Sequence, residues 1–208
     1  MKERYGSKVF AVSALILCAI CIGIGMRIQM VNAQAITVPT EVYQQEEKLE
    51  LDGAFVEVVK ENTQGYALKV NAAQLVSYNE YLREHGMEKV AGSGHDNKCI
   101  VEVDITFFNE GNTDGFLDVM GYKLIPERKD EYFIIDSALW RSVEKNAPGE
   151  TMGMTLLPNT TYRTSIPFVK NTSDDLVYSD SVDDTKWILN ITNAPVQKMV
   201  DITCERNP

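Results

Sequence analysis

An uncharged stretch of 18 residues near the amino terminus, Val9–Met26, constrains this chain more than any other feature. At about 1.5 Å of rise per residue, a helix of this length nearly crosses a hydrocarbon core of about 30 Å. Basic residues precede it at Lys2, Arg4 and Lys8, and Arg27 closes it. Because basic residues favour the cytoplasmic side, we expect a single-pass plasma-membrane helix with the amino terminus in the cytoplasm and the carboxyl-terminal domain outside.

A cleaved signal peptide is the alternative, because it also begins with a basic segment and an apolar core. We favour an uncleaved anchor, since signal cores usually hold about 7 to 15 residues and Arg27 lies where a cleavage region is normally uncharged. The chain then divides into a basic tail and membrane anchor at 1–30, a polar stalk at 31–52 and an extracytoplasmic domain at 53–208.

The part of the chain expected outside is strongly acidic. The first 30 residues hold four of the 20 basic residues and one of the 30 acidic residues. The remainder therefore carries 16 basic and 29 acidic side chains, a formal net charge of −13. Such a surface repels phosphate backbones, so the composition argues against nucleic-acid binding.

Alternating apolar residues predict that the exterior domain is mainly β. The expected strands are 54–60, 66–70, 99–108, 116–125, 132–136, 152–156, 161–169, 187–191 and 199–204, separated by turn-forming groups. A short helix capped by Ser77 or Asn79 and ended by Gly86 is expected after the second strand. Short alternating strands favour a two-layer antiparallel sandwich over a parallel sheet.

Cys99 and Cys204 are the only cysteines after the apolar stretch. Strict alternation puts Cys99 on the same face as Val101 and Val103, and Cys204 shares the apolar face of its own strand. Both sulfurs should point into one core, where an oxidising exterior would permit a disulfide. A bridge closing a loop of about 105 residues would stabilise the fold by roughly 4 to 5 kcal/mol in the chain-entropy treatment. Two buried thiols are the alternative.

Four segments together resemble a known family: GYALKVNAAQLVSYNEYL (65–82), VEVDITFFNEGN (101–112), LLPNTTYRTSIPF (156–168) and ITNAPVQKMVDI (191–202). The combination is similar to uncharacterised extracytoplasmic domains of unknown function that are attached by one amino-terminal span in Gram-positive bacteria. The resemblance implies an uncleaved anchor and an immunoglobulin-like β-sandwich. It assigns no activity and no catalytic residue.

Catalytic and metal-binding candidates are few. His85 and His95 are the only histidines, and Ser93, His95 and Asp96 lie in one loop, whereas triad members normally converge from separate elements. Zinc-ligand spacing, a phosphate-binding glycine loop and a dinucleotide fingerprint are absent from the sequence. We therefore expect no enzyme, no cofactor and no metal.

Two surface features remain as candidates for binding. The carboxylates between Asp174 and Asp184 could supply oxygens to calcium, but their spacing does not match a calcium loop, so a solvated acidic loop is favoured. Trp140 and Arg141 fall in an expected connection, where an exposed aromatic and a guanidinium would form a contact patch. A Trp140 side chain tucked beneath its loop is the interpretation we favour.

The sequence is therefore most typical of a membrane-anchored extracytoplasmic interaction module without catalytic activity. The expected partner is an envelope protein, a peptide or a cell-wall component. An extracellular carboxylate-dependent hydrolase and a calcium-dependent adhesion domain are the alternatives.

Overall fold

The computed structural model describes most of the chain in seven stretches. These are residues 3–33, 37–57, 61–87, 99–127, 132–148, 153–170 and 186–206. The chain divides into two compact units, Met1–Thr37 and Val38–Pro208.

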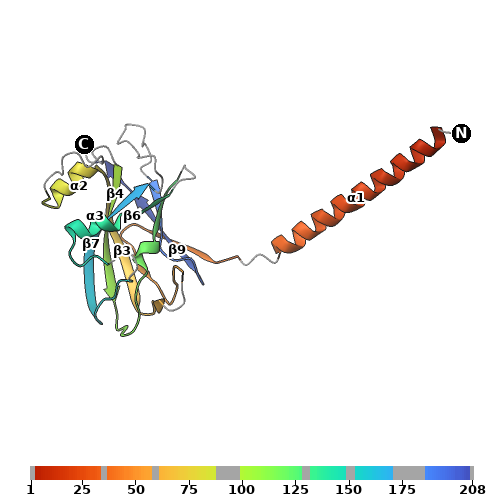
Figure 1. The fold of residues 1–208 in the computed structure, drawn as a ribbon. Coiled ribbons are helices and arrows are strands. Elements are labelled where there is room, and N and C mark those ends of the chain that lie inside the picture. Colours follow the sequence, from red (N-terminus) through yellow and green to blue (C-terminus); the bar gives the residue numbers. More distant parts are fainter. Residues whose placement is uncertain are drawn as a thin grey trace. The chain divides into compact units, whose positions relative to one another are not determined.

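The first unit holds one helix, α1 (Glu3–Ala33), drawn in red and orange in Figure 1. Large apolar side chains on it face solvent, among them Ile20, Ile22 and Ile24, which are 52%, 64% and 55% exposed. Within the described residues, no helix combines the length and the apolar character that crossing a membrane requires. The expected transmembrane span is therefore not confirmed.

The second unit is mainly β, and its described strands belong to a single mixed sheet. The strands are β1 (Thr40–Gln44), β2 (Lys48–Glu50), β3 (Tyr66–Ser77), β4 (Cys99–Asn109), β5 (Lys123–Pro126), β6 (Phe133–Ile135), β7 (Thr160–Lys170), β8 (Lys186–Asn190), β9 (Gln197–Thr203) and β10 (Glu205–Arg206). Nine of them follow the order β1-β9-β8-β5-β6-β7-β4-β3-β10, and β2 pairs with β3 beside this path. Among these described strands, only β1 with β9 and β10 with β3 are parallel pairs.

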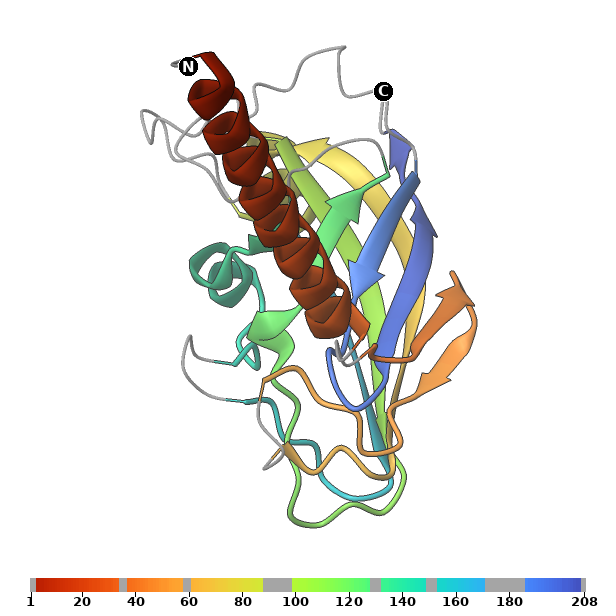
Figure 2. The ribbon, with the colours of Figure 1, turned by 90° about the vertical axis from the view of Figure 1, so that its right-hand side faces the viewer.

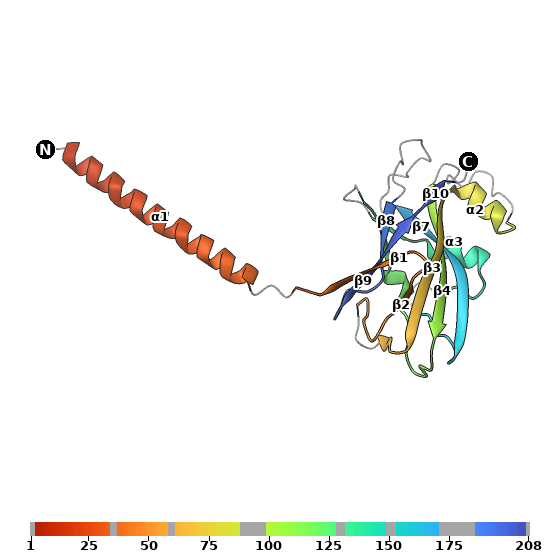
Figure 3. The ribbon, with the colours of Figure 1, turned by 180° about the vertical axis from the view of Figure 1, so that it is seen from behind.

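Three long neighbouring strands, β3, β4 and β7, lie toward one end of this order and form its longest pairings (Figure 3). Along β4, the side chains of Val101, Val103, Ile105 and Phe107 are fully buried in the core. This pattern confirms the predicted alternation, because successive side chains of a strand point to opposite faces of a sheet.

The sheet curves until it nearly closes into a barrel, which is where the prediction of a two-layer sandwich is wrong. β1 pairs with β9 and then turns into β2, which pairs with β3; β9 itself continues into β10, which also pairs with β3. The chain thus passes twice from one end of the strand order to the other, once from β1 to β2 and once from β9 to β10. Figure 2 shows the consequence, with the blue strand β9 beside the yellow strand β3. One curved sheet encloses the core, so no second sheet is needed to cover it.

Two short helices cover part of the outer surface of this sheet. α2 (Tyr78–Glu84) contacts β3 and β4, and α3 (Ser137–Val143) contacts β7. Ser77 caps α2 by accepting a 3.2 Å hydrogen bond from the Glu80 amide, as one of the two predicted caps. Tyr81, Leu82 and Leu139 pack with Ile100, which explains why an outward-facing residue of β4 is fully buried.

The predicted stalk at 31–52 is wrong in its second half. β1 and β2 lie within it, and Leu49 and Leu51 are buried in the core. Leu49 and Leu51 alternate with charged residues over only a few positions, and so short a pattern does not distinguish a strand from a linker. Two expected strands are also reduced: in the described parts of 54–60 and 152–156, Phe55 and Met154 form only isolated bridges.

Candidate functional site

The outward face of β5, β8, β9 and β1 is the candidate functional surface. Neither α2 nor α3 packs extensively against these strands, and no other described helix of the second unit does. Val42 on β1 lies opposite Met199 on β9, and Ile188 on β8 lies opposite Ile125 on β5. Met199, Ile188 and Ile125 are half-buried, and Val42 is 51% exposed. The face therefore offers apolar contacts in the middle of a polar surface.

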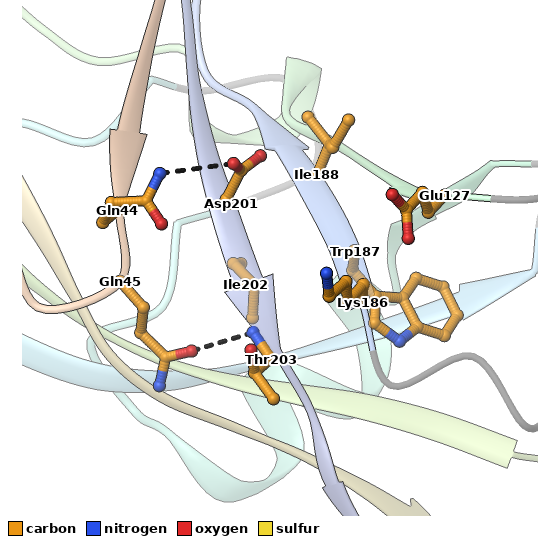
Figure 4. A pocket seen from close by; sticks show the side chains of 9 residues that line it. All are labelled: Gln44, Gln45, Glu127, Lys186, Trp187, Ile188, Asp201, Ile202 and Thr203. Carbon is orange, nitrogen blue, oxygen red and sulfur yellow. Dashed lines mark hydrogen bonds between the residues drawn. The ribbon is translucent and has the colours of Figure 1, made fainter.

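A pocket of about 270 Å³ lies on this face (Figure 4). It is lined by Gln44, Gln45, Glu127, Lys186, Trp187, Ile188, Asp201, Ile202 and Thr203. Alternation along β8 explains its construction, because Lys186 and Ile188 point outward while the Trp187 ring packs inward against Phe133, edge to face at 5.0 Å. The pocket thus has an apolar residue on its floor and a buried aromatic layer behind it.

One side of the pocket is fixed by two glutamines. Gln44 Nε2 donates a 3.3 Å hydrogen bond to Asp201 Oδ2, and Gln45 Oε1 accepts a 3.0 Å hydrogen bond from the Thr203 amide. Gln45 Nε2 also donates to the Asn71 carbonyl at 3.4 Å. Figure 4 shows the first two bonds as dashed lines. The Gln44 side-chain amide therefore orients the Asp201 carboxylate along the edge of the pocket.

The other side carries Lys186 and Glu127. The Glu127 amide donates to the Lys186 carbonyl at 3.2 Å, which places the two residues opposite each other at the end of β5 and the start of β8. Within the described residues, neither the Lys186 ammonium nor the Glu127 carboxylate has a hydrogen-bond or ion-pair partner. The pocket therefore presents an ammonium group and two carboxylates around Ile188.

A second polar cluster lies on the outward face of β3, β4 and β7. Glu102, only 5% exposed, is 2.9 Å from His85 Nε2 and accepts a 2.8 Å hydrogen bond from Gln74 Nε2. Asp104 Oδ1 and Oδ2 accept bonds of 3.0 and 3.1 Å from Arg163 Nε. Both carboxylates are occupied by neighbouring donors, so this arrangement serves chiefly to hold strands and α2 together.

The candidate contact patch at Trp140 and Arg141 is not formed, and Trp140 is tucked in, the interpretation that the sequence favoured. Trp140 is fully buried, and its Nε1 donates a 3.0 Å hydrogen bond to Thr164 Oγ1. The segment is a helix, α3, rather than a connection, and the carboxylate of Asp136 caps it by accepting from the Leu139 amide at 2.9 Å. The helix turns Trp140 toward the sheet while Arg141, one residue on, faces solvent.

Cys99 and Cys204 are both buried in the core, as their phase predicts, but no disulfide joins them. Cys99 is on β4, which pairs with one edge of β3 and places Cys99 opposite Ser77. Cys204 immediately precedes β10, which pairs with the other edge of β3, so β3 separates the two cysteines. Two strand spacings amount to about 9 to 10 Å, beyond the roughly 7 Å between Cα atoms that a disulfide allows. Burial raises the pKa of the Cys204 thiol to about 12, with a smaller contribution from Cys99.

Several sequence candidates lie outside the described residues: the 93–96 segment with His95, and the acidic cluster between Asp174 and Asp184. His85 is described, and it is the carboxyl-terminal cap of α2, one residue before Gly86, where the sequence predicted the end of the helix. Among the described residues, no group of three His, Cys, Asp or Glu side chains is placed to hold a metal ion.

Sequence reasoning missed Lys186, Glu127 and Asp201. Each is a single charged residue at an outward position of a strand or beside its end, an ordinary feature of a solvated sheet. Alternation alone could have placed Lys186 and Ile188 on one face. Only the pairing of β9, β8 and β5 brings the three charges together.

Fold and site together define a mainly β domain of one nearly closed mixed sheet, with a polar pocket on the face that no described helix of this unit covers. The family described as a domain of unknown function, DUF5028, matches residues 40–198, and the chain belongs to this family. The match begins at β1, within the segment predicted to be a stalk. No curated protein and no solved structure matches the chain.

Proposed function

We propose that this protein is an extracytoplasmic binding module that contacts an envelope protein, a peptide or a cell-wall component through the outward face of β5, β8, β9 and β1. The observation that carries the proposal is the pocket around Ile188, where Lys186 and Glu127 have no partner among the described residues. Charged groups held beside an apolar floor give orientation and contact area together, as ligand sites do.

Attachment to the plasma membrane, with the domain outside, is part of this proposal. Its support is the sequence: the uncharged stretch Val9–Met26, basic residues before it, and the strongly acidic remainder. Alkaline extraction of membranes tests attachment, and protease added to intact cells tests orientation. Release of the full chain by alkali, or protection of the acidic domain from protease, would contradict this part of the proposal.

A site-specific photo-crosslinker tests the binding face. A benzoylphenylalanine placed at Ile188, on the pocket floor, should capture an envelope component in living cells. The control places the same group at Leu157, which is 76% exposed and does not line the pocket. Adducts at 188 that are missing at 157 support the proposal, while equal labelling or no labelling at 188 argues against it.

The two alternatives from the sequence gain no specific support from the described residues. A carboxylate-dependent hydrolase needs two available carboxyl groups facing a substrate. Glu102 and Asp104 are both engaged by neighbouring side chains, and of the two carboxylates in the pocket Asp201 already accepts a hydrogen bond from Gln44. A calcium-dependent adhesion domain rested on the cluster between Asp174 and Asp184, which lies outside the described residues.

A further inference from the structure

We infer that the pocket around Ile188 binds a small zwitterion, an amino acid or a short peptide with a free ammonium group and a free carboxylate. This inference rests on the proposed binding function and names the chemistry of the ligand. It follows from the signs of the charges in the pocket and from their positions around the apolar floor.

The strand register sets those positions. Asp201 lies directly across from Ile188, and Lys186 lies two residues along the same strand as Ile188 and opposite Thr203. Paired residues are about 5 Å apart, residues two apart in one strand about 6.6 Å, and diagonal pairs such as Asp201 and Lys186 about 7 to 8 Å. A ligand seated on Ile188 therefore has a carboxylate on one side and an ammonium at one end.

The charges favour a ligand that carries both signs over a ligand of a single sign. An anion without a positive group would reach Lys186 but would also meet the carboxylates of Asp201 and Glu127. A cation without a negative group would meet the carboxylates of Asp201 and Glu127, but it would be repelled by Lys186 and would leave that ammonium group without a partner. Specificity of this kind comes from repulsion as well as attraction. A ligand with both groups can direct its carboxylate to Lys186 and its ammonium to Asp201.

The size of the pocket limits the ligand to a small molecule. About 270 Å³ is just below the range of roughly 300 to 1,000 Å³ typical of drug-sized ligands. An amino acid or a dipeptide fits this space, with an aliphatic side chain on Ile188. The Gln44 amide, held on Asp201 at 3.3 Å, keeps that carboxylate in place before the ligand arrives.

Calorimetric titration of the full chain in detergent with alanyl-alanine tests the inference. Three blocked forms serve as controls: the N-acetyl dipeptide, the dipeptide amide, and the dipeptide blocked at both ends. Loss of either charge should weaken binding about tenfold, because a hydrogen bond to a charged group contributes that much. Equal binding of the doubly blocked dipeptide would overturn the inference, as would no binding of alanyl-alanine at millimolar concentration.

Substitutions locate the site. Lys186→Met should weaken binding of the free dipeptide about tenfold. It should also abolish the difference in affinity between the dipeptide and its amide, because the variant has no ammonium group to bind the dipeptide carboxylate. Lys145→Met, at an exposed lysine outside the pocket, should change neither value. Melting temperatures check that each variant folds, and Asp201→Asn gives the reciprocal test with the N-acetyl form. Unaltered discrimination in Lys186→Met would refute the site.

The crosslinking experiment separates this inference from the proposed function. Capture of an envelope component at 188 together with failure of every zwitterion test would leave the binding face in place and remove the ligand class. Failure of both experiments would remove both proposals.

Discussion

The ammonium group of Lys198 on β9 donates a hydrogen bond of 2.6 Å to the main-chain carbonyl of Glu50 on β2. Lys198 is only 3% exposed, and its Nζ is also 3.4 Å from a carboxylate oxygen of Glu41 and of Asp52. Glu41 lies on β1, in register with Lys198. One cation therefore ties together β9, β1 and β2 where the sheet nearly closes.

Lys198→Met should weaken this closure. The substitution keeps the apolar stem but leaves the Glu50 carbonyl without its donor, so we expect the free energy of unfolding to fall by about 1 to 3 kcal/mol. Urea denaturation of the full chain in detergent measures the loss. Lys48→Met is the matched control, because its ion pairs with Glu50 and Glu110 lie at the surface and should contribute less. An equal loss in both variants would contradict the role given to Lys198.

The hydrogen bond between Trp140 and Thr164 predicts a second stability effect. Thr164→Val has nearly the same shape but leaves the buried indole N–H without an acceptor, which should cost about 1 to 3 kcal/mol. Thr161→Val, at an exposed position of the same strand, should have little effect. If Trp140 were an exposed contact residue instead, Thr164→Val would leave both stability and indole fluorescence unchanged.

The core cysteines predict a reactivity pattern. In a Cys18→Ser, Cys21→Ser background, neither Cys99 nor Cys204 should react with a thiol reagent at pH 8 while the protein is folded, because both are buried. After unfolding without reductant, both should react. Recovery of no thiol from the unfolded chain would show that the two are joined by a disulfide after all.

The raised pKa of Cys204 predicts a loss of stability in alkali. The pKa of this thiol is about 12 in the folded protein, against 9.0 for an unperturbed cysteine, so the unfolded chain loses this proton first. The resulting contribution to stability is fully present below pH 9 and is lost as the pH rises toward about 12. Buried tyrosines titrate in the same direction, so the measurement is the difference between the wild type and Cys204→Val. The free energy of unfolding of the wild type should fall relative to that of Cys204→Val as the pH rises. A constant difference between the two proteins from about pH 8 to pH 11 would contradict this prediction.

Much of the β structure could be predicted from the sequence because alternation is a local property. It predicted the strands that became β4, β7, β8 and β9 and the inward position of Cys99 and Cys204. Leu75 shows the limit of such local patterns. Its spacing with Tyr78 and Leu82 also fits a helix, but the helix begins only at Tyr78, and Leu75 belongs to β3. A short apolar run fits either period, and pairing with β4 decided between them.

By itself, the sequence determined which residues of the predicted strands face the core, that a short helix begins at a cap at Ser77 or Asn79, and that the chain carries a large negative charge. Only the tertiary structure decided that β2 and β10 both pair with β3, and that the side chain of Trp140 on α3 packs toward the sheet. It also decided that Lys186, Glu127 and Asp201 surround one pocket. The physical reason is range: the side-chain period of a strand is set by its own backbone. Which strands become neighbours depends instead on contacts between residues far apart in the chain.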